Sequence, residues 1–200
     1  MTYAPLSSVA GLLLAGGHSR RFGSEKAVAQ LGDRPLLDLV AARFRECAAF
    51  AVSARPGSAA AQYARIRGWT VLHDNDTDPA GPLAGVDAGL HWAEANLYTH
   101  LAVAPCDTPL IPHDLFTMLY NALGDAPAAY AATASGAHPL CSIWAVSLRE
   151  MLSANLLANA HPPVLRFLQT HGAIEVHFPN APSFANANTP DSLLQMACSR

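Results

Sequence analysis

Cations and glycines follow the first apolar run of the chain, where residues 9–27 read "VAGLLLAGGHSRRFGSEKA". Two glycines end the apolar run, and a loop carrying Arg20, Arg21 and Lys26 follows. Glycines allow a sharp turn and bring backbone N–H groups close to an anion. Arginines offer fork-shaped donors for phosphate oxygens, and a lysine supplies a point charge. Taken alone, such a pattern is more often an ordinary surface turn with solvated cations, and a bound phosphate is the alternative.

The spacing of these glycines narrows the kind of phosphate site. It matches neither the GxxxxGK[ST] loop of P-loop NTPases nor the GxGxxG fingerprint of dinucleotide-binding folds. A Rossmann dehydrogenase is therefore disfavoured, and cations directly after the glycine turn suit a triphosphate better than a nicotinamide dinucleotide.

An acid follows a later apolar run, in "THLAVAPCDTPLIP". Asp107 stands there between two prolines, at the end of an expected strand. Mg²⁺ in nucleotide sites is held by one or two carboxylates together with phosphate oxygens. Asp107 is therefore a candidate metal ligand. The alternative is an N-cap of the next helix, but Asp114 already stands at the start of that helix.

Two further polar segments indicate a ligand site less specifically. Asp74 begins the acidic loop "DNDTDPAGPLAG", in which the pattern of an EF-hand calcium loop fails after the third acid. An Asx-rich turn is the plainer reading of that loop. Asn186 and Asn188 precede a capped helix near the C-terminus, and amides at such positions usually satisfy turn backbone.

The elements that must position these residues alternate in type. Apolar runs of strand length and stretches of helical periodicity follow each other four times, which predicts βαβ units, a mostly parallel sheet and right-handed crossovers. The expected strands are 9–16, 48–55, 69–74 and 99–105, and the expected helices are 34–47, 58–68, 81–95 and 112–123.

The second half is less regular. It predicts strands over 127–134, 140–147 and 173–178, and helices over 148–158 and 162–172. The segment 184–197 closes the chain with a helix capped near Thr189-Pro190. No repeat or linker divides the chain, so a single α/β domain over residues 1–200 is expected.

This alternation brings the polar segments together. In open parallel sheets, ligands bind beyond the carboxyl ends of the strands, where the strand order reverses. Residues 16–26, Ser53 to Arg55, Asp74 and Asp107 each lie at the end of one of the first four expected strands or directly beyond it. We therefore expect them at one edge of the sheet.

Composition limits the possible partners. The formal charge of −3 and the charged fraction of 14% argue against a nucleic acid or an anionic membrane surface as partner. The apolar run 9–15 is too short to cross a bilayer and has no basic region before it, so a cytoplasmic protein is expected. Four cysteines without a CxxC pair argue against a structural zinc site or a disulfide framework.

Five segments together resemble a known family. They occur in the order and spacing seen in the MobA-type molybdenum cofactor guanylyltransferases, and they are "LAGGHSRRFGSEKA", "GPLAG", "PCDTPLIP", "HPLCSIWAV" and "FANANTPDSL". The resemblance covers nearly the whole chain. It implies a single Rossmann-like three-layer domain with nucleotidyltransferase activity. Such enzymes join GMP from GTP to the phosphate of molybdopterin, release pyrophosphate and use Mg²⁺.

The resemblance also implies roles for individual residues. Lys26 corresponds to the lysine that contacts the nucleotide phosphates, Asp74 to a nucleotide-contacting acid, and Asp107 to the Mg²⁺ ligand. The backbone around the nucleotide corresponds to Leu14, Ala15, Gly16 and Gly17. We expect Lys26, Arg20 and Arg21 to neutralise the triphosphate while Asp107 holds Mg²⁺ against it.

Substrate choice rests on fewer residues. Gly16 in "LAGG" resembles the guanylyl branch, whereas the cytidylyl branch has "LAAG", so GTP is expected rather than CTP. Ser53 and Arg55 stand where the family commonly has an Asn near the nucleotide. The alternatives are a nucleotidyltransferase that uses CTP or a sugar 1-phosphate acceptor, and a non-catalytic accessory protein that binds the cofactor. Molybdoenzyme apoproteins or other cofactor-biosynthesis proteins are compatible partners.

Overall fold

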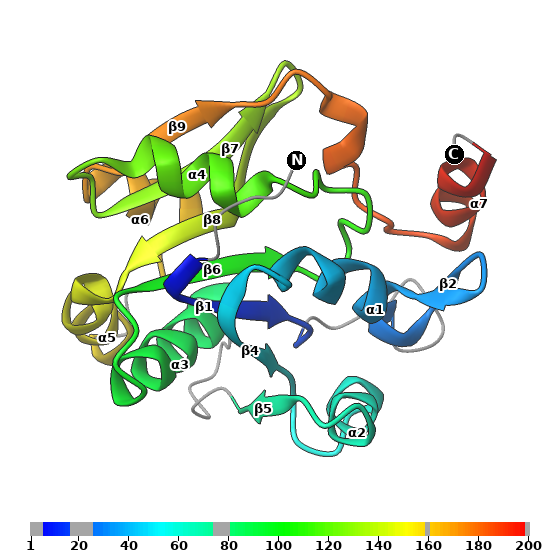
Figure 1. The fold of residues 1–200 in the computed structure, drawn as a ribbon, viewed down its shortest axis with the longest axis horizontal. Helices are drawn as coiled ribbons and strands as arrows, with labels where there is room; N and C mark the ends of the chain where they lie inside the picture. Colours follow the sequence, from blue (N-terminus) through cyan, green and yellow to red (C-terminus); the bar gives the residue numbers. More distant parts are fainter. Residues whose placement is uncertain (1–5, 17–25, 74–80, 159–160, 199–200) are drawn as a thin grey trace.

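A seven-stranded sheet forms the centre of the molecule (Figure 1). The computed structural model describes residues 6–16, 26–73, 81–158 and 161–198. The strand order is β5-β4-β1-β6-β8-β7-β9, and β8 alone runs antiparallel to both of its neighbours in this sheet of the described chain. A mostly parallel sheet is thus confirmed. The strands are β1 (Leu6–Leu14), β4 (Cys47–Ser53), β5 (Thr70–Leu72), β6 (His100–Pro105), β7 (Ala128–Thr133), β8 (Gly136–Ala145) and β9 (Ile174–His177).

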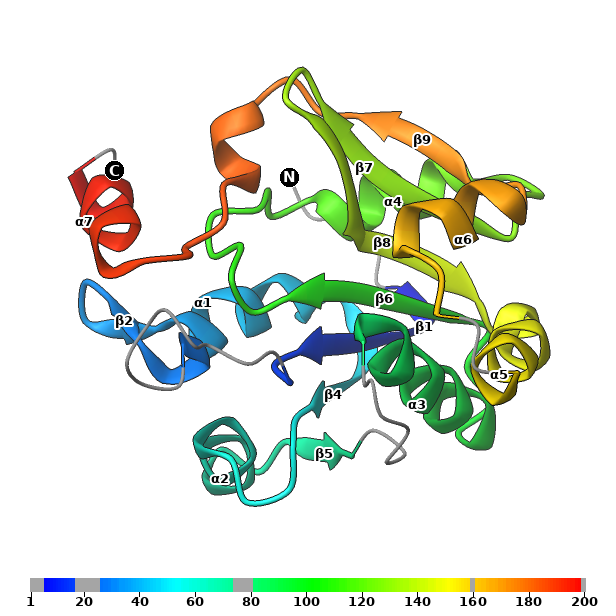
Figure 2. The same cartoon turned by 180° about the vertical axis from the view of Figure 1, so that it is seen from behind.

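Two helical layers cover the two faces of this sheet (Figures 1 and 2). Side chains alternate along β1, so that Val9 and Leu13 enter one apolar core while Leu12 and Leu14 enter the other. The first core is closed by α1 (Leu36–Ala41), α2 (Ala59–Ile66) and α4 (Leu115–Leu123). The second is closed by α3 (Pro82–Ala95), α5 (Arg149–Leu157) and α6 (Val164–Thr170). The three-layer architecture is confirmed.

The strand order reverses at β1. From there the chain adds β4 and β5 on one side and then β6 on the other. Leu14 at the end of β1 lies opposite Ser53 of β4 and Pro105 of β6. Hydrogen bonds extend this pairing by one residue, from Ala15 N to Ser53 O at 2.8 Å and from Cys106 N to Leu14 O at 3.0 Å. The loops after β1 and β6 therefore leave the sheet side by side, at its switch point.

The helix expected over 34–47 is wrong at both ends. A hairpin of β2 (Gln30–Leu31) and β3 (Arg34–Pro35) precedes α1, and the 3₁₀ turn η2 (Ala42–Phe44) follows it. Gly32 has a φ of +69° at the first of the two hairpin loop positions, a conformation that favours glycine. The apolar spacing was correct, but the Gly-Asp turn signal before it was overlooked.

The strand expected over 140–147 begins earlier than predicted, at Gly136, and the turn lies at 134–135. Proline cannot donate a hydrogen bond to a neighbouring strand, so Pro139 is unusual inside β8. The register between β7 and β8 shifts between Tyr130 and Ala131, which places Pro139 in an irregular stretch where no ladder hydrogen bond is needed. The longer β8 carries its first residues beyond the end of β6.

The C-terminal helix α7 (Pro190–Cys198) packs outside the main layers, beside β2 (Figures 1 and 2). The chain reaches it from β9 through the 3₁₀ turn η4 (Ala181–Phe184). A third, smaller apolar cluster lies beneath α7, which we call the C-terminal core; it consists of Leu31, Leu36, Leu39, Ala187, Leu193 and Met196.

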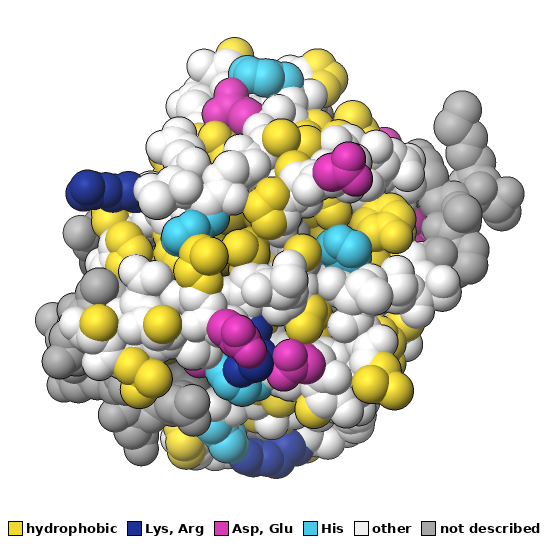
Figure 3. Space-filling model, turned by 90° about the vertical axis from the view of Figure 1, so that its left-hand side faces the viewer, with side chains coloured by type: hydrophobic (Ala, Val, Ile, Leu, Met, Phe, Trp, Pro, Cys, Tyr) yellow, Lys and Arg dark blue, Asp and Glu magenta, His cyan; other side chains and the backbone are white. Residues whose placement is uncertain are grey.

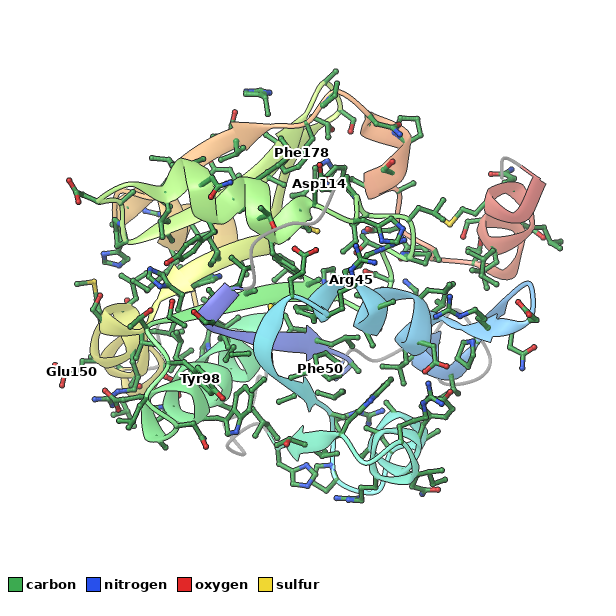
Figure 4. The ribbon with its side chains drawn as sticks, in the orientation of Figure 1. Arg45, Phe50, Tyr98, Asp114, Glu150 and Phe178 are labelled. Atoms are coloured by element: carbon green, nitrogen blue, oxygen red, sulfur yellow. The ribbon has the colours of Figure 1, made fainter. Side chains whose placement is uncertain are left out.

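The surface is mixed in character. Figure 3 shows one face on which charges of both signs and single apolar side chains lie between polar groups. Glu150 of α5 points into solvent at the outer edge of the molecule, whereas Phe50 of β4 lies between the α1 and α2 regions (Figure 4). In the part of the chain that the structure describes, no helix is long and apolar enough to cross a membrane.

Candidate active site

Three polar side chains from distant parts of the sequence meet beyond the end of the sheet. Lys26 opens the 3₁₀ turn η1 (Lys26–Val28), Asp107 follows β6, and Asn188 precedes α7. Lys26 Nζ donates to Asp107 Oδ2 at 2.9 Å and to Asn188 Oδ1 at 2.7 Å. The Lys26 and Asp107 side chains are only 12% and 23% exposed. The expected proximity of Lys26 and Asp107 is therefore observed, with Asn188 as a further partner.

Lys26 is the single lysine in the sequence, since all other Lys and Arg positions are arginines. A compact ammonium on a flexible stem is thus used at this one position, where it bonds two oxygen atoms from different loops. Chemistry directed at side-chain amines consequently reports on this site alone.

Asp107 has an oxygen atom that its neighbours leave unsatisfied. Oδ1 is buried and has no hydrogen-bond partner among the described residues, whereas Oδ2 accepts from Lys26. A buried, unpartnered carboxylate oxygen is unfavourable unless a donor or a cation reaches it. The Asp107 side chain therefore fits a metal ligand on geometric grounds.

The backbone around Asp107 is firmly held. Its carbonyl oxygen accepts from Ala187 N at 2.8 Å, and Thr108 Oγ1 donates to Pro105 O at 3.1 Å. Arg43 of η2 contacts His113 and donates through Nη2 to Pro109 O at 3.4 Å. The carboxylate is thus presented by a turn that is anchored on both sides.

Residues expected around the nucleotide lie at the same edge where the structure describes them. Leu14 and Ala15 are buried at the end of β1, Gly16 is half-buried, Ser53 is buried, and Arg55 is exposed. Gly17, Arg20, Arg21 and Asp74 lie outside the described residues.

Two aromatic rings pack together at the segment that leads to Asn188. The His138 ring of β8 stacks on Phe184 with centroids 4.7 Å apart, and its Nε2 lies 2.9 Å from Thr133 Oγ1. Burial lowers the pKa of His138 below its ordinary value, so the ring is neutral at pH 7. Phe184 leads within four residues to Asn188, so this stacking anchors the segment that reaches Lys26.

Two of the cysteine thiols are not reactive at neutral pH. Cys47 and Cys141 form no disulfide, and burial raises the pKa of both thiols to about 12. The described residues also contain no group of three or more His, Cys, Asp or Glu side chains placed to hold a metal ion. A cation at Asp107 would therefore take further ligands from a bound substrate.

A mostly parallel sheet with polar side chains gathered at its switch point is the usual place for a ligand in an open α/β fold. The profile of the MobA-like NTP transferase domain matches residues 11–173, and the chain belongs to that family.

Curated relatives are similar over nearly the full length. The chain is 41% identical over 185 residues to a molybdenum cofactor guanylyltransferase of Cereibacter sphaeroides, covering 92% of each chain. It is 36% identical over 201 residues to one of Mesorhizobium japonicum, covering 94% of each. A solved structure of molybdopterin-guanine dinucleotide biosynthesis protein A from Archaeoglobus fulgidus matches with a TM-score of 0.75 and 22% identity, covering 95% of this chain and 98% of that one.

The interpretation of Asn188 as an amide that only satisfies turn backbone is wrong, because its Oδ1 accepts from Lys26. The sequence did carry a signal. Two asparagines at alternate positions directly before a capped helix mark this segment as polar, but the pattern does not show which group the amides contact.

Proposed function

We propose that this protein transfers GMP from GTP to the phosphate of molybdopterin and releases pyrophosphate. The observation that carries the proposal is the 2.9 Å contact between the Lys26 ammonium and the Asp107 carboxylate at the switch point of the sheet. The molybdenum cofactor guanylyltransferases named above are similar over more than nine-tenths of the chain, which supports this choice of reaction.

The reaction requires stabilisation of negative charge on the leaving pyrophosphate and does not require removal of a proton. An anionic phosphate oxygen of the acceptor attacks the α-phosphorus of GTP, a P–O bond forms, and the bond to the β-phosphate oxygen breaks. Because the nucleophile is already anionic, no general base is required. Catalysis then depends on positioning and on neutralising the pyrophosphate as it leaves. Lys26, with Arg20 and Arg21, is proposed to neutralise the triphosphate.

Lys26 changes partners in this scheme. In the structure its ammonium bonds Asp107 and Asn188. We propose that it turns toward the phosphate oxygens when the nucleotide binds, which frees Asp107 Oδ2 from its bond to the ammonium. Mg²⁺ bound by Asp107 would supply positive charge to the phosphate oxygens, and the buried, unpartnered Oδ1 supports this assignment.

The nucleotide is proposed to contact the backbone of Leu14, Ala15, Gly16 and Gly17, and Asp74 is proposed to contact it from the loop after β5. GTP is proposed over CTP because of Gly16. Molybdopterin is proposed to bind toward β8 and the segment before Asn188. A cytoplasmic location and delivery of the product to molybdoenzyme apoproteins complete the proposal.

The test is pyrophosphate release from GTP, Mg²⁺ and molybdopterin. Lys26→Met and Asp107→Asn should each lower turnover by about a hundredfold or more. The matched controls are Arg45→Met and Asp114→Asn, at positions that Figure 4 labels. Arg45 is exposed, and Asp114 makes no side-chain cap hydrogen bond to α4, so both controls should keep turnover within about twofold.

The outcomes that contradict the proposal are distinct. Near-normal turnover in Lys26→Met and Asp107→Asn would refute the site. Turnover with CTP but not GTP would refute the nucleotide assignment. Nucleotide binding without pyrophosphate release by the unaltered protein would identify a non-catalytic accessory protein instead.

A further inference from the structure

The C-terminal core lies directly beneath the three polar side chains of the site. Each of them has a close neighbour in sequence among the residues that form or border this core. Ala29 and Leu31 follow Lys26 by three and five positions, Leu110 follows Asp107 by three, and Ala187 immediately precedes Asn188. No residue of β1, β4 or β6 belongs to this cluster among the described residues.

Backbone hydrogen bonds connect this core to the polar atoms above it. Ala29 N donates to Lys26 O at 3.0 Å and closes η1, and Leu36 N donates to Ala29 O at 2.9 Å. Ala187 N donates to Asp107 O at 2.8 Å, as already described. A shift of the packed side chains would therefore move the backbone that carries Lys26 and Asn188.

Helix α7 contributes the last residues, in sequence order, of the C-terminal core. Leu193 and Met196 are 8% and 7% exposed, one turn apart on the same face of the helix. Thr189 and Ser192 cap the helix reciprocally, with Ser192 N donating to Thr189 Oγ1 at 3.1 Å and Thr189 N to Ser192 Oγ at 3.0 Å. Asn188 directly precedes this cap, so the seating of α7 fixes the direction in which its amide points.

The backbone expected to surround the nucleotide packs in the two main cores and not in the C-terminal core. Leu14 belongs to the core under α3, α5 and α6, and Ala15 to the core under α1, α2 and α4. Loosening the C-terminal core should therefore disturb Lys26 and Asn188 while the end of β1 stays in place.

We propose that Leu193 is a positioning residue, through which α7 fixes the backbone segments that carry Lys26 and Asn188 relative to the Asp107 turn. The role of α7 is then to preorganise the phosphate-neutralising group of the active site. This inference rests on the proposed function for its kinetic consequence, but not for its structural one.

The kinetic test compares Leu193→Ala with Leu194→Ala. Leu194 is the adjacent residue of α7 and is 66% exposed, so the control makes the same chemical change on the same helix outside the core. In pyrophosphate release, Leu193→Ala should lower kcat by roughly ten- to a hundredfold, the loss typical of a catalytic group displaced by about 1 Å. The KM for GTP should stay within about twofold, because Leu14 and Ala15 at the end of β1 do not pack in the C-terminal core. Leu193→Met, which conserves volume, should restore kcat.

The second measurement needs no substrate. Because Lys26 is the only lysine, an amine-acylating reagent followed by mass spectrometry reads its accessibility, with the N-terminal amine as internal reference. Acylation of Lys26 should be several-fold faster in Leu193→Ala and unchanged in Leu194→Ala and Leu193→Met. The folded fraction, measured by circular dichroism at the assay temperature, normalises both readouts. Where Leu193→Ala does not fold, Leu193→Val takes its place, with smaller changes in the same direction.

The results separate the two proposals. Equal kcat and equal Lys26 acylation in Leu193→Ala and Leu194→Ala would overturn the positioning role. An unaltered protein that releases no pyrophosphate would overturn the proposed function, and the acylation rates would still decide whether α7 holds Lys26.

Discussion

Breaking the Lys26–Asp107 pair from either side should destabilise the fold, and breaking it from both sides should cost less than the sum. At the observed 2.9 Å, two unit charges attract by about 6 kcal/mol at an effective dielectric constant of about 20. Desolvation cancels most of this attraction. The side chains are 12% and 23% exposed, between the fully buried and the surface case. We therefore expect a net coupling of about 1–2 kcal/mol.

The assay is a double-mutant cycle in urea at pH 7, with Lys26→Met, Asp107→Asn and the double variant. Arg149 and Glu150 form the control pair; their side chains lie 3.3 Å apart, and Glu150 is 85% exposed. For that pair a coupling of at most about 0.5 kcal/mol is expected. A Lys26–Asp107 coupling no larger than that of the control would refute the reasoning, because the two groups would then not meet in solution.

Three further predictions concern the frame around the site. Gly11→Ala should lower the free energy of unfolding in urea by about 1–3 kcal/mol, because a Cβ there would lie 2.5 Å from Cδ1 and 3.2 Å from Cβ of Phe44. Gly81→Ala is the control, because a Cβ at position 81 would meet no atom within 4 Å. Leu97 closes α3 at a φ of 62° and is 91% exposed, so Leu97→Gly should raise the thermal midpoint by relieving about 1 kcal/mol of backbone strain, and an unchanged or lower midpoint would contradict this. Burial lowers the pKa of His138 below 6.5, so the folded state favours the neutral ring and the free energy of unfolding should fall as the pH drops below 6.5. His138→Gln should reduce this dependence of the free energy of unfolding on pH, by at most about 1.4 kcal/mol per pH unit. An identical pH dependence in the variant would show that His138 does not contribute.

The alternation of strands and helices was readable from the sequence because each strand of a covered parallel sheet is apolar on both faces. The run beginning at Val9 gave β1, and Gly81-Pro82 marked the start of α3 within one residue. Gly68, expected to end a helix, lies just past α2 with a φ of +72°. These features depend on local rules, and local rules were sufficient to predict them.

The proximity of Lys26 and Asp107 followed from a general rule of open sheets, applied to the ends of two strands. Asn188 could not be placed in the same way, because its position depends on how α7 packs against β2 after the sheet is complete. The hairpin at Gly32 has a local signal in its Gly-Asp turn, but the apolar spacing after it favours a longer helix. The early start of β8 depends on a register shift against its partner strand β7 as well as on its own residues.

The position of the nucleotide is tested most directly by a crystal structure with Mg²⁺ and a GTP analogue that cannot be cleaved between the α- and β-phosphates. We expect the triphosphate beyond the ends of β1 and β6, with the Lys26 ammonium on a phosphate oxygen and the Asp107 carboxylate on the metal. A triphosphate bound elsewhere, with the bonds from Lys26 to Asp107 and Asn188 intact, would contradict this expectation.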